Sequence, residues 1–327
     1  MMKKFWSGAI LATYMVGSQA NADYSRHEEA KAFVDRMVKQ HKFDAKMVES
    51  WLAQAEKKQA ILDAISRPAE KTKPWFEYRK IFLDNDRIQQ GVAFWKENEK
   101  TLITVSERYG VDPAIIVAII GVETRYGRHM GSYRVIDALT TLGFDYPPRS
   151  EFFRKQLEEL FLLAREQKQN PLDLKGSYAG AMGYGQFIPS SYRHYARDFD
   201  GDGVADIWTN KNDAIASVAN YFKAHGWQSG QPVFVRAKVK GKVDESLVNS
   251  TARPTMTIAE LRKKGVEPAS SVAADQSASL LSYVQEDGDE YWLGFNNFYV
   301  ITRYNRSQLY AMAVWQLSEA IKEARKA

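Results

Sequence analysis

The feature that most constrains this chain is a run of apolar residues, Ala114–Ile120, within the segment Pro113–Gly127 (P-A-I-I-V-A-I-I-G-V-E-T-R-Y-G). Asp112 and Pro113 precede the run as an N-cap and a first-turn proline, so the segment predicts a helix. A helix that is apolar on all sides is stable only when other elements cover it. We therefore expect this helix at the centre of a core, in a chain of 327 residues that is long enough to build one.

A carboxylate follows this apolar run by one turn, at Glu123. Glutamate is almost never buried unless it is paired or has a function. Both the helix C-terminus and apolar surroundings disfavour the charged form and raise the pKa of a carboxyl group, as a general acid requires. Glu123 is therefore the candidate catalytic acid. The alternative is that Glu123 pairs with Arg125 or Arg128 at the surface.

A second segment, Gly176–Ser190, is rich in glycine, small residues and aromatic residues. Its glycines allow the backbone to approach a ligand closely. Ser177, Tyr184 and Gln186 offer hydroxyl, aromatic and amide groups that suit a sugar. We interpret the segment as a sugar-binding loop, with a tight structural loop as the alternative. It is not a phosphate-binding loop, because no Gly-Lys-Ser/Thr follows.

A third segment, Asp198–Asp206, has the spacing of an EF-hand calcium loop. Aspartates at every second residue can converge on one hard cation, and Gly203 stands at the sharp turn. Thr209 replaces the usual glutamate at position 12, and a single loop favours a structural clamp over a calcium sensor. The alternative is a solvated acidic turn. The expected ligands of calcium, or alternatively of sodium, are Asp198, Asp200, Asp202, Asp206, the Val204 carbonyl and, in place of the missing glutamate, Asp213.

The N-terminus predicts export. A basic start, Met1–Lys4, precedes the mostly apolar Phe5–Gly17 and the small-x-small sequence Ala20–Ala22, which is the pattern of a secretory signal peptide. The apolar stretch is too short to span a bilayer, and no later one reaches 18 residues. We expect cleavage after Ala22 and a soluble periplasmic protein. Cysteine is absent, which excludes disulfides, thiolate metal sites and a lipid-modified cysteine.

Apolar spacing predicts a mainly helical fold with a small β-containing insert. Helical periodicity runs through Ser25–Ser66, a Pro/Lys-rich link follows at Arg67–Pro74, and Arg87–Tyr109 is interpreted as one long helix. Alternation predicts a strand within Pro232–Val243, and further strands are expected in Tyr283–Tyr304. Ala269–Ser279 is interpreted as a linker, and Thr257–Glu260 as a capping box. Further helices are predicted at Phe152–Gln167, Asp213–His225 and Leu309–Lys326.

The overall charge argues against a nucleic-acid partner. The chain carries 45 Lys+Arg against 40 Asp+Glu, a net charge of +5, and removal of Lys3 and Lys4 with the leader leaves +3. This mild excess suits a polyanionic cell wall but lacks the concentrated basic patch of a nucleic-acid-binding surface.

Together, these segments resemble the membrane-bound lytic murein transglycosylase B family (glycoside hydrolase family 103). The resemblance runs from about residue 27 to the C-terminus and is strongest at Gly121–Gly127, Ala179–Ser191 and Asp213–Trp227. It implies an α+β fold with a lysozyme-like helical core, an additional helical domain, a small β domain and an EF-hand-like ion loop in the core. The expected domains are a signal peptide (1–22), an N-terminal helical part (23–85), a catalytic core (86–230) with the ion loop (198–213), a β-containing part (231–280) and a segment returning to the core (281–327).

The resemblance also implies an activity and site residues. It implies non-hydrolytic cleavage of the MurNAc–GlcNAc β-1,4 bond in peptidoglycan, leaving 1,6-anhydro-MurNAc ends, with Glu123 as the single acid/base. Pro148 stands where some relatives carry an arginine, which weakens one expected subsite contact, and the lipoprotein cysteine is absent. The groove residues matched are Tyr78, Arg149, Ser177, Gln186, Tyr221, Tyr304, Asn305 and Tyr310, each tyrosine having core packing as its alternative.

Two rival functions stay open at the level of the sequence. A hydrolytic muramidase would share fold and substrate but use water, and a catalytically silent scaffold would bind peptidoglycan and recruit other wall enzymes. Glu123 within its motif argues against a catalytically silent scaffold, because a protein that only binds glycan has no need of a carboxylate there. Partners in cell-wall synthesis or secretion are compatible with the sequence but are not identified by it.

Overall fold

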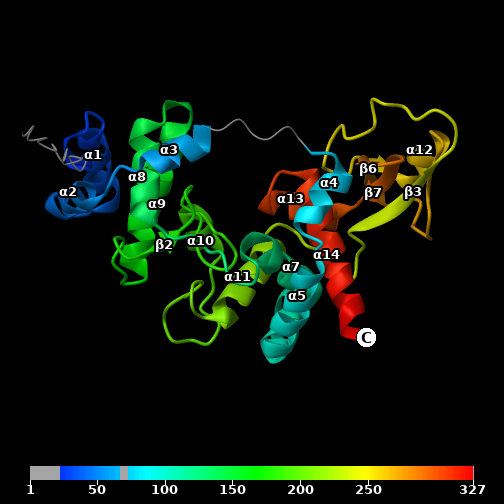
Figure 1. Ribbon diagram of the computed structural model, residues 1–327, viewed down its shortest axis with the longest axis horizontal. Helices are drawn as coiled ribbons and strands as arrows, with labels where there is room; N and C mark the ends of the chain where they lie inside the picture. The colour runs from blue at the N-terminus through cyan, green and yellow to red at the C-terminus, as the bar shows by residue number, and fades with distance from the viewer. Residues whose placement is uncertain (1–22, 67–72, 327) are drawn as a thin grey trace, which may run out of the picture.

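The computed structural model describes residues 23–66 and 73–326, so the expected leader and most of the expected link lie outside the described residues. Within them, no helix has both the length and the apolar character needed to cross a membrane. The fold is mainly helical, with one five-stranded sheet and a short two-stranded pairing of β1 with β2, which confirms the predicted class (Figure 1). Short elements connect the larger ones: η1 (Tyr24–Arg26), α4 (Trp75–Tyr78), η2 (Arg79–Ile81), β1 (Tyr133–Arg134), η3 (Pro147–Arg149), β2 (Lys175–Gly176) and α10 (Pro189–Tyr195).

An N-terminal lobe gathers five helices, at the left of Figure 1. The first three, α1 to α3, pack with α8 and α9, although 68 or more residues separate α3 from α8 along the chain. Their apolar faces share one buried cluster, which includes Phe33, Leu52 and Phe161. The hydrophobic cores therefore divide along a different line from the expected border at residue 85. The helices are α1 (Ala30–His41), α2 (Ala45–Gln54), α3 (Gln59–Ser66), α8 (Val135–Asp145) and α9 (Ser150–Glu166).

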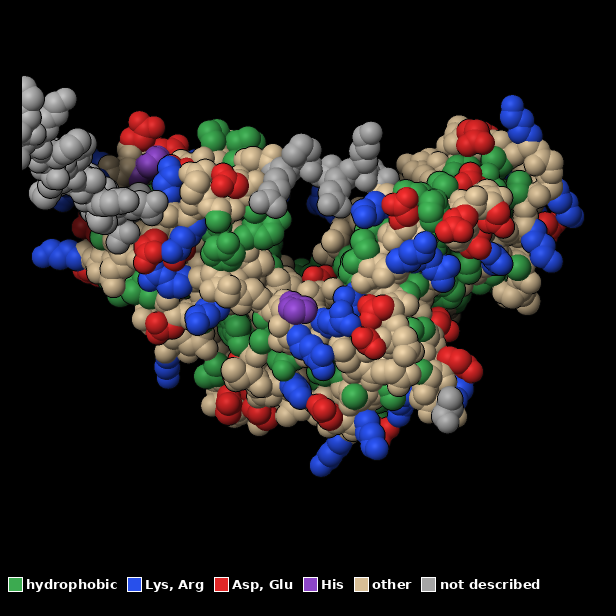
Figure 2. Space-filling view, in the orientation of Figure 1, with side chains coloured by type: hydrophobic (Ala, Val, Ile, Leu, Met, Phe, Trp, Pro, Cys, Tyr) green, Lys and Arg blue, Asp and Glu red, His purple; other side chains and the backbone are tan. Residues whose placement is uncertain are grey.

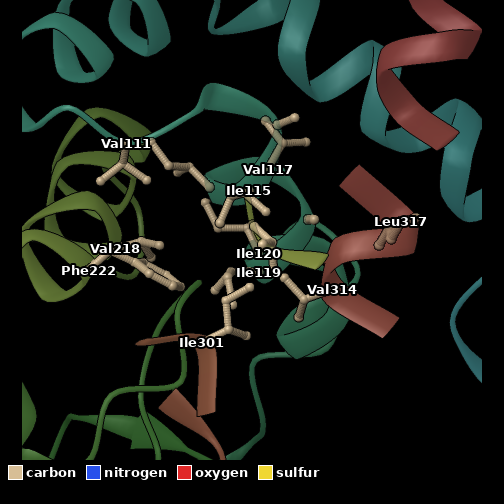
Figure 3. Close-up of a cluster of buried hydrophobic side chains, with 14 of the residues drawn as sticks. Val111, Ile115, Val117, Ile119, Ile120, Val218, Phe222, Ile301, Val314 and Leu317 are labelled. Carbon is tan, nitrogen blue, oxygen red and sulfur yellow. The ribbon is translucent and has the colours of Figure 1, made fainter. Parts of the chain in front are cut away.

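The central helix α7 (Pro113–Thr124) is surrounded by helices, as its composition requires. Asp112 caps it by accepting a hydrogen bond from the backbone N–H of Ala114 (2.8 Å), and every residue from Ala114 to Gly121 is buried. Its neighbours are α5 (Asn85–Glu97), α6 (Glu99–Tyr109), α11 (Lys211–Ala224) and α14 (Gln308–Lys326). Figure 3 shows side chains of α7 meeting those of α11 and α14: Ile115, Val117, Ile119 and Ile120 with Val218, Phe222, Val314 and Leu317.

The expected single helix Arg87–Tyr109 is wrong: the structure has α5 and α6 with a break at Asn98. Asn98 leaves helical geometry (φ −113°, ψ 19°), and its side-chain amide donates to the carbonyl of Phe94 (2.7 Å). This local side-chain bond competes with helix continuation, as asparagine commonly does.

One antiparallel sheet, with strand order β4-β6-β7-β3-β5, forms the third part of the molecule. Thr257 and Glu260 form the predicted capping box of α12. Residue 280, an expected boundary, lies inside β6. The expected strands of Tyr283–Tyr304 are the end of β6 and the whole of β7, and the last nine residues of this segment form helix α13. The elements are β3 (Phe234–Val239), β4 (Met256–Thr257), α12 (Ile258–Lys263), β5 (Val266–Pro268), β6 (Ser277–Gln285), β7 (Gly288–Gly294) and α13 (Asn296–Tyr304).

The surface is hollowed between the N-terminal lobe and the part that holds the sheet, as Figure 2 shows. In the same orientation, α5, α7 and α11 lie below this hollow (Figure 1). The C-terminal end of α7 carries Glu123, so the fold places a carboxyl group at the end of a helix that is buried among α5, α6, α11 and α14.

Candidate active site

Glu123 stands on the last turn of α7 and is half-buried. The surface ion pair considered as its alternative is not formed. Arg125 turns away and donates to Gln90 Oε1 (3.0 Å) and Asp84 Oδ1 (3.1 Å), and Arg128 is exposed. Among the described residues the bonded partner of the Glu123 carboxyl is a neutral hydroxyl, that of Tyr310, at 2.5 Å.

The surroundings of Glu123 raise its pKa to about 7. The main cause is desolvation by the apolar core, and the hydrogen bond donated by Tyr310 opposes it by favouring the charged form. No charged side chain of the described residues contributes to the shift. A carboxyl group with a pKa near neutrality can give up and take back a proton at physiological pH, which is the requirement for general acid/base catalysis.

The turn after Glu123 is held by Thr124 and a glycine. Thr124 Oγ1 donates to the carbonyls of Ile120 (3.1 Å) and Tyr184 (2.9 Å) and accepts from the backbone N–H of Gly127 (3.0 Å). Gly127 has a φ of +89°, and a Cβ there would lie 2.3 Å from the Tyr184 ring. The end of α7 is thus fastened to the glycine-rich segment, because only glycine fits between them.

Ser177 and Gln186 line one depression of about 480 Å³, together with the segment 128–133. Gln186 has a left-handed backbone (φ 52°), and its amide nitrogen donates to the carbonyls of Met130 (3.2 Å) and Gly183 (3.0 Å). Ser177 Oγ accepts from two backbone N–H groups, those of Ala179 and Ala181. The Ser177 hydroxyl proton and the Gln186 carbonyl oxygen therefore stay available for a ligand.

Three of the expected tyrosines gather around Glu123. Tyr310 bonds it directly, and the charge of Glu123 raises the pKa of Tyr78, Tyr304 and Tyr310, after desolvation as the main cause. The Tyr304 hydroxyl donates to the carbonyl of Gly185 (2.6 Å), and a Cβ at Gly185 would lie 2.8 Å from that hydroxyl. The glycine-rich segment therefore positions Tyr304 beside the carboxyl group.

The other groove residues lie differently. Tyr184 and Tyr221 are buried, at 9% and 8% exposure. Tyr184 packs on Gly127, and the Tyr221 hydroxyl donates to the carbonyl of Arg303 (2.6 Å). The observed contacts of both tyrosines are thus those of core packing, which was the alternative to a role in the groove. Arg149 and Asn305 are exposed, and Arg149 lies over the rings of Phe152 and Phe153 at the start of α9.

Two carboxylates that could have assisted Glu123 are engaged elsewhere. Asp137 is buried in the N-terminal lobe, where it pairs with Arg134 (2.8 Å) and accepts from the backbone N–H of Glu56. Asp145 accepts from the Tyr24 hydroxyl (2.5 Å) and pairs with Lys57 (2.9 Å). Both carboxylates therefore have charged partners within the N-terminal lobe.

The segment 128–133 was missed by the sequence reasoning as a site element. It lines the depression with Arg128, His129 and Met130 beside Ser177 and Gln186, and the side chains of Arg128 and His129 are exposed. The position of this segment directly after the Glu123 motif is the sequence feature that could have indicated it.

Three of the expected cation ligands converge. The carboxylates of Asp198, Asp200 and Asp202 offer oxygens that all lie within 4.8 Å of one another. Gly201 and Gly203 turn the loop with φ of +82° and +96°. An all-oxygen donor set on a glycine-turned loop fits a hard cation such as calcium.

Asp206 and Asp213 lie outside this cluster of three. Asp213 is fully buried, and its carboxylate oxygens accept from the backbone N–H groups of Phe199 and Asp206, both at 2.8 Å. Burial raises the Asp213 pKa to about 6. Through these contacts, Asp213 holds the loop segment from Phe199 to Asp206 against the start of α11. Asp206 accepts from the backbone of Thr209, and the Val204 carbonyl accepts from Asp206 N–H (3.1 Å).

Comparisons with known proteins agree with this geometry. A family model, the transglycosylase SLT domain, matches residues 25–319. The chain is 46% identical over 316 residues to the membrane-bound lytic murein transglycosylase B of Escherichia coli strain K12, covering 94% of this chain and 86% of that protein.

Two solved structures show the same fold over nearly the whole chain. The catenated lytic transglycosylase SltB1 of Pseudomonas aeruginosa is 52% identical, with a TM-score of 0.90 over 93% of this chain and 100% of that one. The Escherichia coli lytic transglycosylase Slt35 in complex with calcium is 45% identical, with a TM-score of 0.84 over 94% and 96%. The match of residues 25–319 to the SLT domain, together with the 46% identity to a lytic murein transglycosylase over most of the chain, establishes that this chain belongs to the lytic transglycosylase family of enzymes.

Proposed function

We propose that this enzyme cleaves the MurNAc–GlcNAc β-1,4 bond of peptidoglycan without water, with Glu123 as its only acid/base. The observation that carries the proposal is the isolation of Glu123: it is the carboxyl group with a pKa of about 7, and no charged neighbour contributes to that value. Glycosidases that hydrolyse their substrate ordinarily use two carboxylates, about 5–5.5 Å or 6.5–9.5 Å apart. The engagement of Asp137 and Asp145 in ion pairs of the N-terminal lobe supports a different route.

A single carboxyl group suffices if the substrate supplies the nucleophile. Glu123 gives its proton to the GlcNAc O4 as the C1–O4 bond breaks, and the carbonyl oxygen of the MurNAc 2-acetamido group bonds to C1. The O6 hydroxyl then attacks C1, the acetamido oxygen leaves, and the O6 proton returns to Glu123. The product is a 1,6-anhydro ring, and no water is consumed.

The neighbours of Glu123 suit these two proton transfers. Tyr310 donates to Oε1, which leaves Oε2 to exchange the proton with the sugar. The hydrogen bond also strengthens when Glu123 becomes charged after the first step. We assign Ser177 and Gln186 to contacts with the acetamido or hydroxyl groups of the sugar, since both line the depression with an unused donor and acceptor.

Mass spectrometry of digested peptidoglycan tests this mechanism. Anhydro ends are lighter than hydrolysed ends by one water and are not reduced by borohydride. Products that are mainly reducible would make the enzyme a hydrolytic muramidase and refute the proposed route.

We further propose that Asp198, Asp200 and Asp202 hold a structural calcium ion that clamps the loop before α11. The cation would neutralise the three converging carboxylates and would take no part in the chemistry. The Slt35 relative, solved in complex with calcium, supports this assignment.

Finally, we propose that the chain is exported and acts in the periplasm after cleavage behind Ala22. The basic and apolar residues within 1–22 support this. Cell fractionation with N-terminal sequencing tests it. An intact leader, or retention of most of the protein in detergent-extracted membranes, would argue against it.

A further inference from the structure

A second hollow lies at the other end of α7. About 380 Å³ in volume, it is walled by the start of α7, the loop 227–234 and the face of α14 that carries Trp315 and Lys322. Asp112, at its edge, stands 11 residues before Glu123, so the two sites are about 16 Å apart along the helix axis at 1.5 Å per residue. The hollow is therefore separate from the depression around Ser177 and Gln186.

Two half-buried tryptophans, Trp227 and Trp315, line this hollow. The indole N–H groups of Trp208 and Trp292 donate to protein acceptors, whereas those of Trp227 and Trp315 have no acceptor among residues 23–66 and 73–326. Neither indole nitrogen is among the buried, unpartnered polar atoms of the described residues, so both N–H groups keep some contact with solvent. Two apolar ring systems with free N–H donors offer what an amphipathic ring needs, namely a face to cover and a donor to bind.

The charges in the hollow do not balance, because one lysine stands between two carboxylates. Lys322 pairs with Asp112 (2.7 Å) and Glu319 (2.8 Å), which leaves these three groups with a net charge of −1. This charge disfavours an anionic ligand, whereas the carboxylate oxygens can still accept hydrogen bonds from hydroxyl groups. The electrostatics are therefore compatible with an uncharged, hydroxyl-rich ligand.

The loop that walls the hollow is held in place in advance. Asn297 is fully buried and makes three hydrogen bonds to the loop backbone: its oxygen accepts from Gln228 N–H (2.8 Å), and its amide donates to the carbonyls of Gln228 (2.8 Å) and Gln231 (2.9 Å). The Gln231 side chain is exposed on the hollow side. A loop fixed before binding loses little entropy when a ligand arrives.

We propose that this hollow binds the N-acetylhexosamine units of a second glycan strand, so that the enzyme holds one strand while it cuts another. The inference rests on the proposed function, because that function brings the enzyme to glycan strands, whose N-acetylglucosamine rings are uncharged and rich in hydroxyl groups. Trp227 and Trp315 cover sugar faces, and Gln231, Asp112 and Glu319 bind hydroxyl and acetamido groups.

Nuclear magnetic resonance of the full chain labelled with ¹⁵N tests the proposal directly. The probe is the tetramer of N-acetylglucosamine, which contains no MurNAc and so no cleavable bond. The indole N–H signals, assigned with Trp227→Phe and Trp315→Phe, should shift saturably during titration. Gln231→Ala should weaken the affinity measured from these signals about 5-fold, whereas Gln228→Ala, its matched control on the same loop but outside this hollow, should not.

Two outcomes overturn the proposal. One is the absence of a shift in both indole signals at saturating tetramer. The other is a shift caused by the peptide Ala-Glu-Lys but not by the tetramer, which would make the hollow a peptide site. Because the readout needs no catalysis, it is independent of the proposed reaction: a protein that cuts no peptidoglycan but shows the sugar-induced shifts keeps the second site and loses only the proposed function.

Discussion

Replacing Glu123 by glutamine should remove glycan cleavage and, at the same time, stabilise the fold at neutral and alkaline pH. In the folded protein the pKa of Glu123 is raised from 4.5 to about 7. The neutral form is therefore preferred by the fold, and its stabilising effect is complete below about pH 4.5 and lost as the pH rises through about 7. Glutamine is neutral at every pH and can still accept the hydrogen bond from Tyr310.

The magnitude follows from the size of the shift. One pKa unit corresponds to about 1.4 kcal/mol, so the charged carboxylate costs the fold up to about 3 kcal/mol above pH 7. Because Glu123 is partly exposed, solvent screening reduces this to about 1–2 kcal/mol. For a chain of this size we expect Glu123→Gln to raise the melting temperature by about 2–5 °C at pH 8 and by almost nothing at pH 4.

Differential scanning calorimetry at the two pH values measures this difference, with Glu107→Gln on the exposed face of α6 as the matched control. Cleavage of purified peptidoglycan by the same Glu123 variant should fall at least 10²–10⁴-fold. A melting temperature that is unchanged or lower at pH 8, or an equal rise at both pH values, would show that the carboxyl group is not strained by its surroundings. Cleavage at more than about a tenth of the wild-type rate would exclude Glu123 as the acid.

Three further expectations concern the neighbours of this site. Cleavage should decline as the pH rises through about 7, because Glu123 then loses the proton it must donate. Tyr310→Phe should move that decline to higher pH, because it removes the hydrogen bond that lowers the Glu123 pKa. A pH–rate profile that is the same in the variant and the wild type would contradict this contact. A chelator should lower the melting temperature, since a cation at 100 times its Kd adds about 2.7 kcal/mol to the free energy of unfolding. Asp202→Ala should abolish the difference in melting temperature between chelator and millimolar calcium. Identical melting of the wild type in both conditions would exclude a calcium ion that clamps the loop. Gly127→Ala should destabilise the fold by about 2 kcal/mol or more, because φ is +89° and the new Cβ would meet the Tyr184 ring at 2.3 Å; chemical denaturation measures it, and a wild-type midpoint would contradict the close contact.

Local sequence was sufficient for features that depend on neighbouring residues. The apolar run Ala114–Ile120 required burial and is fully buried. The N-cap at Asp112 and the capping box of α12 depend on side chains two or three residues away, and both form. The convergence of three aspartates follows from their spacing within one loop. In contrast, the break at Asn98 was missed, because the helical periodicity continues on both sides of it.

Features that depend on distant residues were decided by the tertiary structure alone. The pKa of Glu123 reflects desolvation by helices that come from all parts of the chain, and its hydrogen-bond partner, Tyr310, is 187 residues away. The contacts of Tyr304 and Tyr221, which donate to the carbonyls of Gly185 and Arg303, likewise depend on segments far away in the chain. Asp213 accepts from the backbone of the loop that precedes α11. Sequence determines which groups are present and which must be buried, but only the packing of distant elements sets the distances and the loss of water on which their chemistry depends.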